Sequence, residues 1–77
     1  MRTLDEFAVA IRQAATMVIV ITAPGHASAV ARAIDLAGLD EVAGTIAGDD
    51  TIFVATNSEA DARSLAETWI EEQGDER

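Results

Sequence analysis

The sequence predicts an α+β fold, a two-layer sandwich with the order β-β-α-β-β-α, in which a four-stranded antiparallel sheet carries two helices on one face. Three observations favour it. Four short apolar runs are separated by short connections, and two stretches with apolar residues at helical spacing each follow a pair of these runs. The chain has 77 residues, which leaves room for a single domain, residues 1–77.

The first strand pair is predicted in the N-terminal part of the chain. Glu6–Gln13, EFAVAIRQ, has the alternation of a half-buried strand, although its alanines also suit a helix. Ala14–Thr16 then forms a tight connection. Met17–Thr22, MVIVIT, is β-branched and continuously apolar, which predicts a strand buried on both faces.

The first helix is predicted at His26–Gly38. Pro24 and Gly25 end the preceding strand, because proline lacks an amide donor and glycine permits the bend. Gly38 stands where a C-terminal cap belongs. Four apolar residues recur at helical spacing between these signals: Ala27, Val30, Ala31 and Ile34.

The second strand pair is predicted at Val42–Ala47 and Thr51–Thr56. The run TIFVAT, like MVIVIT, is apolar on both faces, whereas two helices cover only one face of a four-stranded sheet. A chain this short buries only about 60% of the surface that it exposes when unfolded. It has no cysteine to add a disulfide, so we expect the uncovered face to drive self-association.

The last helix is predicted at Glu59–Gln73, ending at Gly74. Asn57 and Ser58 both offer an N-cap, and Asp61, three residues after Ser58, makes a variant capping box. The apolar stripe indicates that its tryptophan belongs to the core rather than to a stacking platform. The stripe comprises Ala62, Leu65, Ala66, Trp69 and Ile70.

Composition excludes several classes of function. The net charge is −9, there is no lysine, and the five arginines are scattered, so this chain by itself is not expected to hold nucleic acid or an anionic membrane. With no cysteine and one histidine, we expect no metal site and no cofactor. No catalytic residues are predicted, since no nucleophile–histidine set or phosphate loop is present. No apolar run is long enough to span a membrane and no signal peptide is evident, which predicts a cytoplasmic protein.

The turn Gly48-Asp49-Asp50 is the first candidate site. Glycine and aspartate suit a plain hairpin turn. However, adjacent carboxylates repel each other, and apolar residues flank them, so an interface over the turn would require a positive partner. A guanidinium matches two carboxylates through its fork of donors, and a divalent cation is the competing neutraliser.

The second candidate site is the start of the first helix, Pro24 to Ser28. Free amides and the helix dipole favour an anion there, although an ordinary cap explains the same residues. Together the two sites suit an amino acid with a cationic side chain. His26 is either a surface residue or a neighbour of the ligand. Asp35, late in the helix, opposes the dipole, which indicates a polar partner or plain solvation.

The run GTIAGDDTIF closely resembles the signature of the C-terminal domain of bacterial arginine repressors. TAPGHAS resembles the family's entry into its helix, and ARAIDLAG resembles the helix that ends in an Ile-Asp or Leu-Asp pair. The resemblance covers about Glu6 to Trp69 and includes the order of elements. The first motif is long and specific, whereas the other two are weaker.

The resemblance implies a domain that assembles trimers, two of which stack into a hexamer with L-arginine, the corepressor, bound between them. Asp49 and Asp50 would engage the cationic end of the ligand across the interface. Thr45 and Ala47 match positions beside the ligand, and Ala27 and Asp35 match positions that hold its amino-acid end. In the family, an N-terminal winged helix-turn-helix domain reads operators of arginine-metabolism genes, and this domain is absent from the present chain.

One departure concerns Ser28, where the family usually has a longer polar residue, often Gln or His. Ser28 is the remaining candidate ligand contact, and His26 stands two residues before it. Two other readings stay open on the residues alone. One is a structural self-association module without a ligand, and the other is a small enzyme with a similar sheet.

Overall fold

A computed structural model describes residues 2–75 of the chain. Its elements are α1 (Arg2–Phe7), β1 (Ala8–Ala14), β2 (Met17–Thr22), α2 (Ala27–Ala37), β3 (Val42–Ala47), β4 (Thr51–Thr56) and α3 (Glu59–Asp75). The four strands form one sheet in the order β1-β2-β4-β3, and every neighbouring pair is antiparallel. Apart from α1, the predicted order and the predicted sheet are confirmed.

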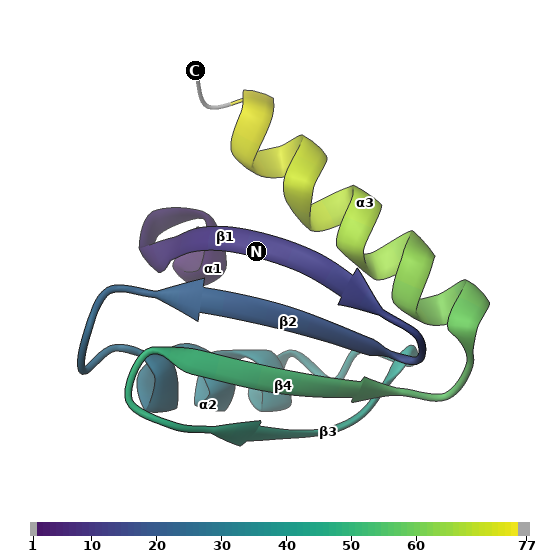
Figure 1. Cartoon of the computed structure of the whole chain (residues 1–77), viewed down its shortest axis with the longest axis horizontal. Helices are drawn as coiled ribbons and strands as arrows, with labels where there is room; N and C mark the ends of the chain where they lie inside the picture. The colour runs from purple at the N-terminus through teal and green to yellow at the C-terminus, as the bar shows by residue number, and fades with distance from the viewer. Residues whose placement is uncertain (1, 76–77) are drawn as a thin grey trace.

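The hydrophobic core lies between one face of the sheet and the helices. In Figure 1 the sheet faces the viewer and α2 lies behind it. The two central strands send alternate side chains into this core, as the two-residue period of a strand requires. Its fully buried large side chains are Trp69, Leu4, Ile34, Ile52, Val18, Val20, Val30 and Val54. Trp69 is therefore a core residue, as predicted.

The caps of the two long helices follow the predicted residues. The Asp61 amide donates to Ser58 Oγ at 3.0 Å, so Ser58 caps α3. Gly38 adopts a left-handed conformation with φ 63° after α2, and its amide donates to the Asp35 carbonyl. By contrast, Gly74 does not end α3, which continues to Asp75. A glycine inside a helix lowers its stability without forcing a stop.

The N-terminal segment differs from the prediction. Glu6 and Phe7 belong to the short helix α1 rather than to the first strand, which begins at Ala8. Six residues are too few to be helical on their own. The helix depends on tertiary contact, because Leu4 is fully buried in the core and Phe7 packs against it.

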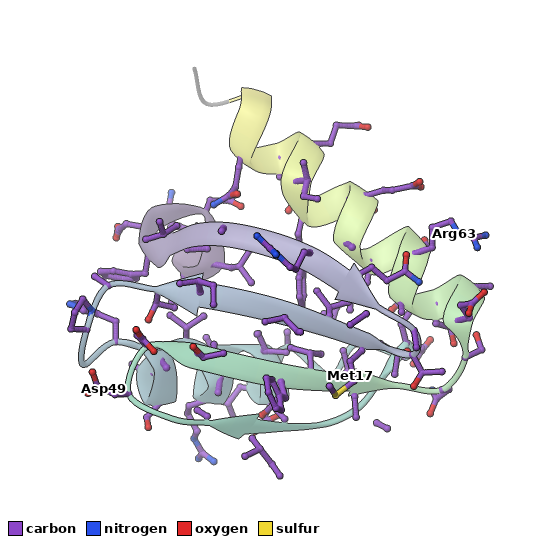
Figure 2. The ribbon with its side chains drawn as sticks, in the orientation of Figure 1. Met17, Asp49 and Arg63 are labelled. Atoms are coloured by element: carbon purple, nitrogen blue, oxygen red, sulfur yellow. The ribbon has the colours of Figure 1, made fainter. Side chains whose placement is uncertain are left out.

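Within one chain only one face of the sheet is covered, as the count of two helices predicts, so that MVIVIT is buried on one face and its burial on both faces stays a prediction. Residues of β2 alternate between buried and half-buried, and those of β4 between buried and exposed or half-buried. We call the uncovered side the open face. It carries Met17, Ile19, Ile21, Ile46 and Phe53, and Met17 is labelled in Figure 2. Ile46 and Phe53, paired across β3 and β4, expose 76% and 47% of their surface.

The left-handed positions give a stability prediction. Gly38→Ala places a Cβ at φ 63°, where nothing crowds it but the backbone is strained, so we expect a loss of about 1 kcal/mol of unfolding free energy. Ala15 is left-handed at φ 53° in the β1–β2 turn, so Ala15→Gly should gain about 0.5 kcal/mol. Denaturant unfolding measures both. If both variants were more stable, or both less stable, than the unchanged protein, the backbone explanation would be wrong.

Candidate functional site

The two candidate sites, 22 residues apart in sequence at Ala27 and Asp49, lie side by side because main-chain hydrogen bonds join them. The amides of Gly25 and Ala27 donate to the Asp49 carbonyl at 3.0 and 3.3 Å. The Thr22 amide donates to the Asp50 carbonyl at 2.7 Å. The β3–β4 turn is therefore tied to the end of β2 and the start of α2 by backbone atoms alone.

The carboxylates of this turn remain open to solvent. Asp49 and Asp50 are exposed, and Thr51 Oγ1 donates to Asp50 Oδ1 at 3.0 Å. Figure 2 shows Asp49 at one end of the sheet and Arg63 at the other. Arg63 pairs with Glu59 at 3.7 Å, and within residues 2–75 no arginine pairs with either turn aspartate.

The start of α2 has no side-chain cap among the described residues. His26 occupies the N-cap position without a side-chain hydrogen bond to the helix, and the first turn holds no acidic residue. The helix N-terminus therefore keeps its partial positive charge uncompensated by a side chain. Ala27 is fully buried there and Ser28 is exposed.

His26 is turned to α1. Its ring stacks on Phe7 with the centroids 5.0 Å apart and the planes at 22°. His26 is exposed, as expected of a surface histidine. Its ring nevertheless packs on another residue, Phe7. The sequence alone does not predict this pair, because the alternating pattern places Phe7 in a strand rather than in α1.

Asp35 and Thr45 form a second polar cluster. Thr45 Oγ1 donates to Asp35 Oδ1 at 2.9 Å, which supplies the polar partner that the sequence indicated for Asp35. Asp35 follows Ala27 by eight residues, or about 12 Å along the helix axis. A shallow hollow beside Asp35 is lined by Gly38, Val42 and Gly44, among others.

The predicted site residues thus line one edge of the molecule, formed by α2 and β3. Asp49, Asp50, Ala27 and Ser28 lie at one end of this edge, and Asp35 with Thr45 lies towards the other. Ala47, half-buried in β3, packs against the core between them. The edge offers aspartate oxygens at both ends and a helix N-terminus at one. This arrangement suits a ligand that carries cationic groups and an anionic group together.

Other classes of site find little support in the part of the chain that the structure describes. Among the described residues, no group of three or more His, Asp or Glu side chains is placed to hold a metal ion. No helix of residues 2–75 combines the length and apolar character needed to cross a membrane.

Comparison with known proteins points to one family. The family described as "Arginine repressor, C-terminal domain" matches residues 4–70 of this chain. The match confirms the resemblance read from GTIAGDDTIF. The matched relatives are repressors rather than enzymes, which agrees with the absence of a predicted catalytic set.

Three relatives called "Arginine repressor" illustrate the similarity. The protein of Anaeromyxobacter sp. (strain Fw109-5) is 65% identical over 52 residues, which cover 68% of this chain and 33% of that protein. The protein of Koribacter versatilis is 47% identical over 64 residues, 83% of this chain and 43% of that protein. The protein of Thermotoga maritima is 41% identical over 66 residues, which cover 86% of this chain and 43% of that protein. This chain therefore spans less than half the length of these relatives.

The geometry of the turn gives a second prediction. Because the Asp49 carbonyl, and not its carboxylate, accepts the two tying hydrogen bonds, Asp49→Asn should leave the unfolding free energy within about 0.5 kcal/mol without added ligand. Removing one of two adjacent negative charges can also stabilise the turn slightly. Denaturant unfolding of both proteins tests this. A loss above about 1.5 kcal/mol would show that the carboxylate itself supports the fold.

Proposed function

This chain belongs to the family of arginine repressor C-terminal domains, and we propose that it is the oligomerisation and L-arginine-binding part of a transcriptional regulator of arginine metabolism. One observation carries the ligand proposal. The exposed aspartate pair of the β3–β4 turn is tied beside the start of α2, which no side chain of the described residues caps, so groups that favour a cation and an anion lie together.

In this proposal Asp49 and Asp50 bind the guanidinium of L-arginine. A planar guanidinium donates two parallel hydrogen bonds to carboxylates, and such charge-assisted bonds are stronger than neutral ones. Ala27 and Ser28, beside the turn at the start of α2, and Asp35, about 12 Å further along α2, are proposed to contact the amino-acid end of a ligand whose guanidinium is held across the interface by the turn of a second copy. Thr45 and Ala47 line the wall between, on β3.

The ligand is proposed to be shared between copies of the chain. In one chain the site residues lie along an open edge, and both turn carboxylates face solvent. A second copy over this edge would exclude water and so strengthen the charged contacts. Following what the family resemblance implies, we propose that L-arginine lies at the interface between two trimers, where it acts as corepressor and stabilises a hexamer.

The open face supports self-association. Met17, Ile46 and Phe53 line a shallow hollow there with almost no polar surface. A large uncovered apolar face on a small sheet is characteristic of a protein–protein contact. The proposed assembly buries this face between copies, which also enlarges the small core of the single chain.

Binding and assembly are then coupled. If L-arginine contacts two copies, it binds the assembled state more tightly than the separate trimers and shifts the population towards the hexamer. The same coupling free energy makes the hexamer bind L-arginine more tightly than the trimer does.

Contact with DNA is proposed for another part of the protein. The net charge of −9 opposes binding of this chain to the phosphate backbone, and the chain spans 33% to 43% of the three relatives described above. We propose that an N-terminal winged helix-turn-helix domain of the full protein contacts operator DNA in the cytoplasm. Assembly of the present domain then sets how many such domains act together.

A purely structural association module is the second candidate. It is favoured by the main-chain hydrogen bonds that tie the Asp49–Asp50 turn to β2 and α2, since these hold the turn without a ligand. The two candidates differ in their response to L-arginine, which the first experiment below measures.

The main prediction concerns molar mass in solution. Light scattering on a sizing column should show a trimer that becomes a hexamer with L-arginine, or a hexamer that L-arginine stabilises against dilution. Asp49→Asn and Asp50→Asn should each raise the L-arginine concentration needed for this response about tenfold or more, since each loses a charge-assisted hydrogen bond.

Glu67→Gln is the matched control for these two variants. It removes the same single negative charge from an exposed position on α3 and should respond like the unchanged protein. A trimer or hexamer indifferent to L-arginine would favour the structural module. A monomer or dimer under all conditions would contradict both candidates.

A further prediction separates the open face from the ligand. Phe53→Asp places a charge in the apolar hollow and should reduce the molar mass in the absence of L-arginine. Ile70→Asp on α3 is the control, because Ile70 is 48% exposed and Phe53 is 47% exposed. Equal loss of assembly in the two variants would argue against the open face as the contact.

A further inference from the structure

The contact between Phe7 and His26 joins α1 to the loop that holds the Asp49 main chain. Phe7 belongs to a helix that Leu4 anchors in the core, where its side chain is fully buried. His26 lies between Gly25 and Ala27, the two residues whose amides donate to the Asp49 carbonyl. A displacement of His26 therefore moves both donors together.

Apart from the two hydrogen bonds to the Asp49 carbonyl and one from Thr22 Oγ1 to the Ala23 carbonyl at 2.8 Å, the loop has few supports. Residues 23–26 are all exposed, and within the described residues no side chain caps α2. The His26 amide donates to the Ala23 carbonyl at 3.2 Å, which shapes the loop but does not attach it to another element. The stacked rings of Phe7 and His26, with centroids 5.0 Å apart, therefore connect this loop to α1.

We propose that Phe7 and His26 are positioning residues for the Asp49–Asp50 turn. Their stacked rings hold the β2–α2 loop to α1, and the amides of Gly25 and Ala27 hold the Asp49 carbonyl. The inference rests on the proposed function in one respect, namely that this turn binds L-arginine. Neither ring touches the ligand in this arrangement. By reciprocity, a ligand bound at the turn also strengthens the packing of α1 against the loop.

The ligand-free test measures hydrogen exchange of single amides in the whole chain. Phe7→Leu keeps an apolar side chain of similar size against the core but removes the ring. We expect faster exchange of the Gly25 and Ala27 amides in this variant and unchanged exchange in the interior of α2, for example at Ile34. Unchanged exchange at Gly25 and Ala27 would overturn the inference whether or not L-arginine binds.

The ligand test uses His26→Asn, which separates positioning from stability. This variant removes the stack and leaves a small polar side chain at the exposed N-cap position, and denaturant unfolding checks that the stability of the domain is kept. We expect calorimetric L-arginine affinity to fall about three- to tenfold, the range expected for an aromatic pair. His26→Phe restores a stacked ring and should restore most of the affinity.

The double variant shows whether the two residues act through one contact. Phe7→Leu combined with His26→Asn should lose no more affinity than the more affected single variant. Additive losses, or single variants that bind as tightly as the unchanged protein, would overturn the inference. Absence of L-arginine binding in the unchanged protein would instead refute the proposed function, and the exchange measurement would still decide the positioning role.

Discussion

The structure depends on a mismatch between a sheet with two apolar faces and helices that cover only one of them. Val18, Val20, Ile52 and Val54 point from the central strands into the single core, and the side chains between them point the other way. Burial of apolar area is the main driving force of folding, and a chain of 77 residues has little of it to spare. The open face is therefore both a cost to the isolated chain and the basis of the proposed assembly.

Main-chain hydrogen bonds hold the Asp49–Asp50 turn in place. Hydrogen bonds from Thr22, Gly25 and Ala27 reach the carbonyl groups of the turn, so the main chain is satisfied and the carboxylates take no part in tying it down. Among the described residues, the one side-chain hydrogen bond to these two exposed carboxylates is that of Thr51 Oγ1 to Asp50 Oδ1, and no arginine pairs with either of them. The backbone thus supports the turn, and the exposed carboxylates stay available for the ligand contact that we propose.

The Phe7–His26 contact extends the support of the turn to the N-terminal helix. Because α1 is short, it has its shape only while Leu4 and Phe7 pack against the rest of the domain. The candidate ligand site, the start of α2 and α1 thus form one mechanically connected region. The open face lies on the other side of the sheet, so assembly through it and loop positioning use different residues.

Local patterns in the sequence determined most of the elements. The β-branched run of β2, the helical spacing of α2 and the cap at Ser58 act over a few residues, so each appears at its predicted position. The motif GTIAGDDTIF also placed the chain in its family. The roles of Asp49, Asp50, Ala27, Ser28, Asp35, Thr45 and Ala47 as ligand contacts stay predictions.

Tertiary structure decided what depends on contacts between distant segments. Phe7 and Glu6 follow an alternating pattern but become helical, because burial of Leu4 outweighs a weak local preference. No local pattern shows that Asp49 accepts from Gly25 and Ala27, or that Thr45 reaches Asp35. The sequence by itself determined the strands, the helices and the family. The packed chain decided which face stays open and which backbone groups meet, because these follow from the shared core and not from neighbouring residues.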